Sequence, residues 1–205
     1  MRSAVTACWA MLSPWMFLAQ TASAQNASEA VVVTDAPKQV RAVRISVPPV
    51  IDGNLNDPVW EQAEVITDFH QTRPGNGTPT SERTEVYVLY DDDALYIGAR
   101  MFDSEPDRIA APVIRHGQGM PSDDRLVVIL DPFNAGRAGY RFETNLNAAR
   151  HDSLYTSPTS FSLDWNTIWD VAANVDGNAW VAEIEIPFKS IPFDPAIENW
   201  GFNFG

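Results

Sequence analysis

Apolar and polar residues alternate along the stretch from Thr84 to Asp103, which gives the clearest structural signal in the chain. β-Branched and aromatic residues occupy alternating positions on either side of the acidic cluster Asp91-Asp92-Asp93. Alternation interrupted by a short polar cluster predicts two antiparallel strands joined by a turn. Both faces of this hairpin are largely apolar, so we expect it to lie inside a sheet that is covered on each side.

Shorter stretches on both sides of the hairpin show the same strand pattern. The triplet Asp176-Gly177-Asn178 separates two of them and predicts a tight turn. Further strands are predicted at 40–47, 126–130, 139–145, 167–175, 180–187 and 200–204, with irregular segments at 72–82, 106–121 and 153–163. Many short strands separated by turn signals predict an all-β, antiparallel sandwich.

One short helix interrupts this pattern near the start of the domain. Asp57 followed by Pro58 is typical of a helix N-cap with proline at the first helical position, and the helix is expected to end at Ala63. Trp60 on this helix is expected to pack onto the sheet. The alternative is that its ring serves as a platform for a sugar.

The first residues predict an export signal. Arg2 is followed by an apolar run at 4–19 and by the small residues Ala22-Ser23-Ala24, which suits cleavage after residue 24. The alternative is an uncleaved membrane anchor, although Pro14 and the short length disfavour it. Residues 25–39 are small, polar and without periodicity, and we interpret them as a flexible leader to one domain at 40–205.

Cysteine content and charge narrow the possible functions. The single cysteine, Cys8, lies in the predicted signal, so the mature chain has no disulfide and depends on packing or bound ions. The chain has 27 acidic and 14 basic residues. This balance argues against nucleic acid or anionic lipid as a partner. It suits a neutral ligand such as a sugar, or hard cations, although ordinary surface solubility explains most of the acids.

Several short motifs together resemble the carbohydrate-binding modules of family 9 and the similar N-terminal domain of long bacterial outer-membrane proteins. In this sequence the motifs are Ile51-Asp52-Gly53 with Asp57-Pro58-Val59-Trp60, Tyr96-Ile97-Gly98 with Asp103, Ser122-Asp123-Asp124 before 126–131, 142–145 with Asp152, Trp165-Asn166 with Trp169, and Trp180 with 183–188. Their common order makes the resemblance more specific than any single motif.

The resemblance covers residues 40–205 and implies a jelly-roll-like sandwich that binds sugars. Members of this family hold a terminal sugar between two aromatic rings, bind calcium structurally and are often attached to enzymes that hydrolyse polysaccharides. The family does not imply that the domain itself cleaves its ligand. In the outer-membrane relatives a large β-barrel follows the domain. The strand at 200–204 has no closing segment after it, so we expect this chain to be part of a longer protein.

Four residues are the candidates for carbohydrate binding. Sugars present apolar C–H faces and a rim of hydroxyl groups, which proteins meet with aromatic rings and with carboxylate, amide or guanidinium groups. Trp165, Asn166 and Trp169 combine tryptophan rings with a polar neighbourhood beside a predicted loop. Both tryptophans could instead be packing residues. Arg100 interrupts an apolar strand, either to bind hydroxyl groups or to pair with a buried acid such as Glu85.

Clustered aspartates are the candidates for a structural calcium site. Asp123, Asp124 and Asp131 form one group and Asp91 to Asp93 another, and calcium prefers six to eight such oxygen ligands. Neither group has the spacing of a known calcium loop. Asp124 could instead pair with Arg125 or cap a turn.

Catalysis and haem binding are weighed as alternatives. The sequence has no GxSxG, HExxH or phosphate-binding glycine loop. Glu183 and Glu185 alternate on one strand, which is more typical of a solvated face than of a catalytic pair. We therefore expect no intrinsic activity, and any glycoside hydrolase activity would reside in another domain. A sandwich that binds haem b would use axial ligands from Met101, Met120, His116 and His151.

These observations predict an exported, non-catalytic module that binds oligosaccharides or polysaccharides in the periplasm, at the outer membrane or outside the cell. Its role would be to serve polysaccharide degradation or uptake together with an attached barrel or hydrolase domain. The alternative is a structural periplasmic domain of an outer-membrane protein that has no affinity for sugars.

Overall fold

The computed structural model describes residues 38–71, 77–157 and 160–205. Gln39–Gly205 forms one compact unit, and the fold described below is that of this unit. The predicted signal at 1–24 lies outside the described residues, as does the predicted leader except for Lys38 and Gln39. In the described part, no helix has the length and apolar composition that a membrane span requires.

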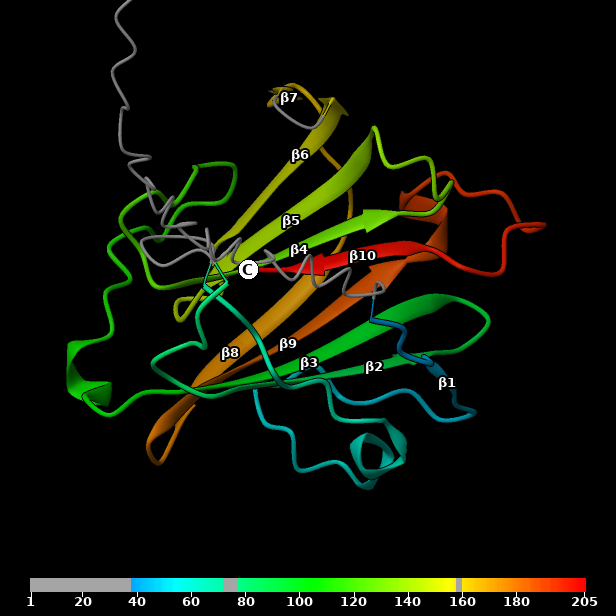
Figure 1. The fold of residues 1–205 in the computed structure, drawn as a ribbon. Helices are drawn as coiled ribbons and strands as arrows, with labels where there is room; N and C mark the ends of the chain where they lie inside the picture. Colours follow the sequence, from blue (N-terminus) through cyan, green and yellow to red (C-terminus); the bar gives the residue numbers. More distant parts are fainter. Residues whose placement is uncertain (1–37, 72–76, 158–159) are drawn as a thin grey trace, which may run out of the picture. The chain divides into compact units, whose positions relative to one another are not determined.

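Two five-stranded sheets make up the domain, one above the other in Figure 1. Sheet A has the order β1-β2-β3-β9-β8, and sheet C has the order β10-β4-β5-β6-β7. The strands of sheet A are β1 (Val43–Arg44), β2 (Thr84–Tyr90), β3 (Ala94–Phe102), β8 (Asp170–Asp176) and β9 (Ala179–Pro187). Those of sheet C are β4 (Arg125–Asp131), β5 (Gly139–Asn145), β6 (Arg150–Ser157), β7 (Ser160–Ser162) and β10 (Gly201–Phe204). The prediction of an all-β sandwich is confirmed.

The central hairpin is β2 and β3, as the alternation predicted. Val86, Val88 and Ile97 face sheet C and belong to the main core, which Phe142 and Leu130 complete from the opposite side. Leu89 and Tyr96 face outward into a second buried cluster. Both faces of the hairpin are therefore buried, one against sheet C and the other in the second cluster, as expected for a central strand pair.

Two details of the fold differ from the expectation. The first strand is short, covering only Val43–Arg44, and pairs in parallel with β2, whereas every other strand pair is antiparallel. The single helix is replaced, within the described residues, by three 3₁₀ turns: η1 (Pro58–Gln62), η2 (Pro106–Arg108) and η3 (Phe188–Ser190). The Asp57 side chain makes no cap to η1. It accepts a hydrogen bond from the Val50 amide instead, at 2.7 Å.

The segment from Ile51 to Gln62 covers the outer face of sheet A. Trp60 is 3% exposed within the cluster that contains Leu89 and Tyr96, so it packs onto the sheet and its ring is not an open platform. A Cβ atom at Gly98 would lie 2.5 Å from the Leu55 side chain and 3.1 Å from the Trp60 ring. Glycine at this position of β3 is therefore what allows Trp60 to approach the sheet so closely.

Glu183 of β9 fixes the same segment to the sheet and is fully buried. Its Oε2 accepts hydrogen bonds from the backbone amides of Asp52 (2.9 Å), Gly53 (2.8 Å) and Asn54 (3.2 Å). Its Oε1 accepts one from the indole Nε1 of Trp60, at 2.9 Å. We call Glu183 with these donors the sheet A latch.

Strands β6 and β7 occupy much of the segment that was predicted to be a loop, so that prediction is wrong. Inward-facing positions of β6 hold Arg150 and Asp152, and outward-facing positions hold His151 and Ser153. Neither face of this part of the strand is apolar, so it shows no hydrophobic alternation. Of these four residues, Arg150 and Asp152 line the site described next.

Candidate functional site

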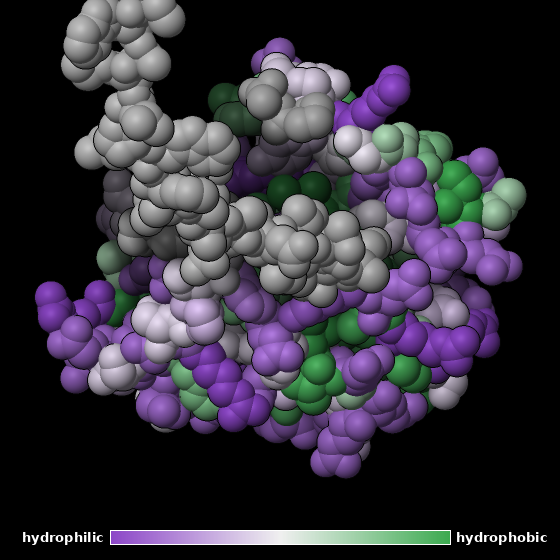
Figure 2. Space-filling model, in the orientation of Figure 1, coloured by the Kyte–Doolittle hydropathy of each residue, from purple (hydrophilic) through white to green (hydrophobic). Residues whose placement is uncertain are grey.

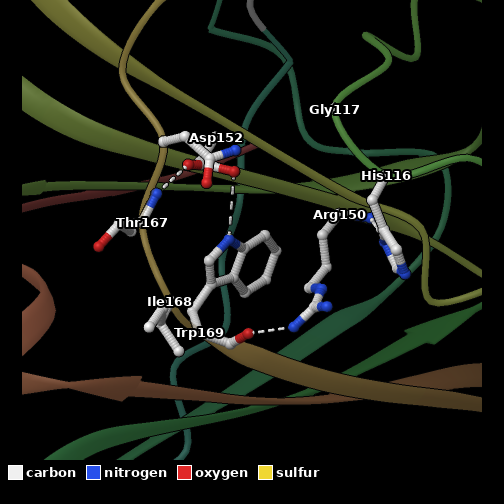
Figure 3. Close-up of a pocket in the computed structure, with 8 residues that line it drawn as sticks. His116, Gly117, Arg150, Asp152, Thr167, Ile168 and Trp169 are labelled. Atoms are coloured by element: carbon white, nitrogen blue, oxygen red, sulfur yellow. Dashed lines mark hydrogen bonds between the residues drawn. The ribbon is translucent and has the colours of Figure 1, made fainter.

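A cavity of about 210 Å³ lies where β6 begins and the chain crosses into β8. It is lined by His116, Gly117, Arg150, Asp152 and the segment 166–169 (Figure 3). Three separate parts of the chain therefore build it: the irregular segment before β4, the start of β6, and the residues that lead into β8. On the opposite side of Trp169 lies the main core, since its ring packs edge to face against Phe142 at 5.3 Å.

Asp152 organises one wall of this cavity. Its Oδ2 accepts a hydrogen bond from the Thr167 amide at 2.7 Å, and its Oδ1 lies 3.5 Å from the indole Nε1 of Trp169 (Figure 3). The carboxylate is buried. It therefore fixes the path of residues 167–169, and much of its hydrogen-bonding capacity is used within the protein.

Arg150 and His116 supply polar groups on another wall. The Arg150 guanidinium donates a hydrogen bond to the Trp169 carbonyl oxygen and lies 3.6 Å from Asp170 Oδ1. The backbone amide of Arg150 donates to His116 Nδ1 at 3.0 Å. Because Nδ1 accepts this hydrogen bond, a neutral His116 carries its proton on Nε2, where it can be donated to another group.

The cavity can therefore meet a small polar ligand with several kinds of group. Guanidinium and imidazole N–H groups donate, the exposed amide of Asn166 donates and accepts, and Ile168, which is 75% exposed, offers apolar surface. This combination of donors, acceptors and apolar surface matches the hydroxyl rim and C–H face of a sugar. The volume is below the about 300–1,000 Å³ typical of drug-sized ligands and suits a single ring.

The structure brings some of the predicted sugar-binding residues together and separates others. Asn166 and Trp169 both line the cavity, but the Trp169 side chain is nearly fully buried and shows no free ring face. Trp165 is half-buried and packs on Tyr140 at 5.1 Å and Phe142 at 6.0 Å. Its role in binding stays a prediction.

Arg100 lies elsewhere, on β3 of sheet A, and does not line this cavity. It stands opposite Glu85 in the strand register, but its ion pair is with Asp176, at 2.6 Å. Glu85 is instead paired with Arg83 and accepts a hydrogen bond from the Tyr87 hydroxyl. In this structure Arg100 joins β3 to the end of β8.

The aspartates proposed as calcium ligands do not converge. Asp123 and Asp124 precede β4 and Asp131 ends it, and a strand of that length separates them by roughly 25 Å. Each binds backbone amides: Asp123 that of Val113, Asp124 that of Ala110, and Asp131 those of Phe133 and Gly136. Within residues 38–71, 77–157 and 160–205, no three acidic, histidine or cysteine side chains are grouped to hold a metal ion. Calcium binding stays a prediction without an assigned site.

The residues considered as haem ligands are also dispersed. His116 lines the cavity, whereas Met120 is buried in a small cluster with Val113 and Ala149. His151 is buried and its Nδ1 lies 2.9 Å from Glu143 Oε2. Haem binding thus gains no support from the placement of these side chains.

A charged cluster occupies the outer face of β5 and β6. Glu143 is 1% exposed and lies within 2.7 Å of Arg141, 2.9 Å of His151 and 3.1 Å of Arg125. Burial alone would raise the pKa of the Glu143 carboxyl, but its hydrogen bonds and ion pairs outweigh burial and the pKa lies below the ordinary value. Glu143 therefore remains ionised, and we call it with its three partners the sheet C ion cluster.

Sequence reasoning did not single out Arg150 as a site residue, and it noted Asp152 only within the family motifs. The available signal was the spacing of Arg150 and Asp152, which places both on one face of a strand. That signal could be used only once the segment was recognised as a strand.

Comparison with known proteins agrees with this architecture. The family model described as carbohydrate family 9 binding domain-like matches residues 51–204. Two solved structures of a family 9 carbohydrate-binding module from Caldicellulosiruptor kristjanssonii, in complex with cellotriose and with glucose, superpose with a TM-score of 0.53. Their sequences are 19% and 20% identical to this chain, and the matches cover 80% of it and 75% and 76% of theirs.

A crystal structure of a protein from Bacteroides uniformis ATCC 8492 superposes with a TM-score of 0.60 at 10% identity, over 80% of each chain. A search of curated proteins found no significant match. At these identities the solved structures establish the similarity of fold, and the family model establishes the family. Because that model spans most of the chain, this protein belongs to the carbohydrate family 9 binding domain-like family.

Proposed function

We propose that this protein is a non-catalytic carbohydrate-binding domain. Its family membership carries this proposal, and the related Caldicellulosiruptor kristjanssonii module was solved with glucose and cellotriose. The proposed binding site is the cavity at the start of β6, because Arg150, His116 and Asn166 present hydrogen-bonding groups there beside apolar surface. Figure 2 shows hydrophilic residues over most of the described surface in that view, which fits a protein that works in water.

The proposal assigns a role to each part of the cavity. Asn166 and the free N–H groups of Arg150 would hold sugar hydroxyls, and His116 would donate from Nε2. Asp152 would position the backbone of 167–169 and orient Trp169 without necessarily touching the ligand. None of these roles requires bond cleavage.

The test is calorimetric titration of the intact protein with glucose and with cellotriose. Replacing Asn166 with alanine should weaken binding about tenfold, because a side-chain hydrogen bond to the ligand is lost. It should leave the melting temperature unchanged, because the side chain is exposed and makes no hydrogen bond within the described part of the chain. Asn174→Ala is the matched control, since Asn174 is an exposed asparagine on β8 outside the cavity.

Two outcomes would count against the proposal. Equal weakening by both alanine variants would remove the cavity as the binding site. No binding to any of a broad panel of neutral oligosaccharides, by a folded protein, would favour the structural-domain alternative. Repeating the titration with calcium and with a chelator would test whether a metal ion supports binding.

We also propose that the protein is exported and serves polysaccharide degradation or uptake with a further domain. The basic residue, apolar run and Ala-Ser-Ala motif at the N-terminus support export. N-terminal sequencing of the protein recovered from cell fractions would test it. A start at Gln25 outside the cytoplasm is the expected result, and an intact Met1 in the cytoplasm would contradict it.

A further inference from the structure

A second cavity, of about 390 Å³, lies on the outer face of sheet C. It is at the end of the sheet where β4 and β6 finish and β5 and β10 begin. The first cavity uses Arg150 and Asp152 at the start of β6, whereas this one uses Tyr155 and Ser157 at its end. The two sites are therefore separate, at opposite ends of the same strand.

Missing side chains create the floor of this second cavity. Gly139 stands opposite Tyr155 in the register of β5 and β6, and Gly201 stands opposite Asp131 in that of β10 and β4. Both glycines line the cavity, and the strand register places Asp131 between them, with Ile129 two positions away on the same face of β4. The two glycines occupy outward-facing positions that carry side chains in most sheets. Because neither has a side chain, the surface is concave there.

Tyr155 forms one side of the hollow, with Phe161 behind it on β7. Tyr155 is half-buried and its ring lies 5.9 Å from that of Phe161, which is 52% exposed. The register of β6 against β7 shifts between Tyr155 and Ser157, a local irregularity of the kind that redirects side chains beside binding sites. A ring beside a bare floor can stack against the C–H face of a pyranose.

Four polar groups around the hollow have no partners among the described residues, whereas the Asp131 carboxylate, which also lines it, has two. The side chains of Arg137, Ser157 and Asn203 and the Tyr155 hydroxyl make no hydrogen bond or ion pair there. Polar groups left without a protein partner at a concave surface are available to a ligand.

Arg137 is the most informative of these groups. Most arginines in the described chain have a carboxylate within 4 Å, but Arg137 has none. The nearby carboxylate of Asp131 is engaged with the backbone amides of Phe133 (3.2 Å) and Gly136 (2.7 Å). In a protein of net charge −13, an exposed and unpaired guanidinium beside a hollow marks the position where an anionic group would be held.

We infer that this hollow is a second glycan-binding site, for a chain that contains uronic acid. Tyr155 stacks on the sugar ring, Arg137 binds the uronate carboxylate, and Ser157 and Asn203 bind hydroxyl groups. The inference goes beyond the proposed function, since it concerns a different cavity and an acidic ligand. A protein with both sites would hold a polysaccharide at two points and gain avidity.

The experiment is calorimetric titration of the intact protein with hexagalacturonate, with cellohexaose as the uncharged comparison. We expect saturable binding of hexagalacturonate that weakens as salt is added, because a charge pair is involved. Arg137→Ala should weaken this binding about tenfold or more and remove most of its salt dependence. Arg41→Ala is the matched control, because Arg41 is another exposed arginine that lines neither cavity.

Tyr155 variants test the stacking role separately. Tyr155→Phe keeps the ring and should retain most of the affinity, whereas Tyr155→Ala should lose it while the protein stays folded by circular dichroism. Absence of hexagalacturonate binding, or binding that Arg137→Ala leaves unchanged, would overturn the inference. Binding of cellohexaose with equal affinity would overturn its acidic specificity.

The two sites fail independently in this design. Asn166→Ala should weaken glucose and cellotriose binding and spare hexagalacturonate, and Arg137→Ala should do the reverse. If the unmodified protein binds hexagalacturonate but neither glucose nor cellotriose, the result counts against the proposed function and not against the second site.

Discussion

The sheet A latch and the sheet C ion cluster both hold a glutamate side chain away from water, but with different partners. Each buries a glutamate on the outer face of its sheet, Glu183 fully and Glu143 almost fully. Glu183 has only uncharged donors, namely three backbone amides and one indole N–H. Glu143 has two arginines and a histidine.

The difference in partners sets opposite shifts in acidity. For Glu183, burial raises the pKa of the carboxyl, and the hydrogen bonds from Asp52, Gly53 and Trp60 only partly counter it. For Glu143, burial acts in the same direction but the guanidinium groups outweigh it, and the pKa is lowered. Uncharged donors can thus form hydrogen bonds with the oxygen atoms of a buried carboxylate without neutralising its charge. Cationic donors form hydrogen bonds and also neutralise the charge.

The largest expected effect comes from removing the latch. Glu183→Ala leaves four donors without their acceptor, of which the Gly53 amide and the Trp60 indole are buried, so we expect a loss of about 3–5 kcal/mol in the free energy of unfolding. Urea denaturation followed by tryptophan fluorescence measures it. Glu185→Ala is the control, on the same face of β9 but half-buried, and should cost less than about 1 kcal/mol. Equal losses for both variants would mean that the latch contributes nothing specific.

A smaller loss is expected when the ion cluster loses its anion. Glu143→Gln keeps the size of the side chain but leaves Arg141 and Arg125 facing one another without a carboxylate. Since both arginines are partly exposed to water, we expect a loss of about 2–3 kcal/mol near neutral pH. Glu61→Gln, a change of the same kind on exposed η1, is the control and should be close to neutral. A neutral Glu143→Gln would show that the cluster is not stabilising.

The smallest effect is the opposite pH dependence of the two glutamates. The contribution of Glu143 is present above its ordinary pKa of 4.5 and is lost as the pH falls through its lowered value. The penalty of Glu143→Gln should therefore shrink as the pH falls below 4.5 and be smaller at pH 3.5 than at pH 7. For Glu183, the raised pKa means that the folded protein holds a proton more tightly than the unfolded chain above pH 4.5.

Ionisation of Glu183 consequently disfavours the folded state as the pH rises through that window. The penalty of Glu183→Gln, which mimics the protonated form, should be smaller at pH 7 than at pH 4.5. Denaturation of both variants and the parent protein across this range provides the measurement. Parallel pH profiles for the two variants would contradict the contrast between charged and uncharged partners.

The parts of the fold that the sequence predicts are those in which side-chain pattern and burial agree. The β2–β3 hairpin, β5 and the β8–β9 hairpin follow from alternation and turn residues. β6 does not, because Arg150 and Asp152 on one face and His151 and Ser153 on the other replace the apolar residues that define a strand pattern. The polar residues of β6 that line the cavity therefore remove the hydrophobic alternation by which a strand is recognised in a sequence.

The candidate site was less predictable than the fold. Asn166 and Trp169 were identified by their composition and their place in the family motifs, and they do line one cavity. Arg150 and His116 could not be joined to them, since nothing local in the sequence reveals that the segment before β4 meets the start of β6. Arg137 and the glycines of the second cavity were hidden for a related reason, because a missing side chain carries no chemical signal until the strand register is known.

The latch also constrains the order in which the domain can form. Its donors precede Glu183 by between 123 and 131 residues. At a synthesis rate of roughly 5–20 residues per second, Trp60 is synthesised about 6–25 seconds before its acceptor Glu183. During that interval Trp60 has no hydrogen bond to hold it against the apolar surface of β2 and β3. The chain must also lose the entropy of closing a loop of this length before the hydrogen bonds of the latch can form. The segment that covers the outer face of sheet A is therefore synthesised early, but its hydrogen bonds to Glu183 can form only late.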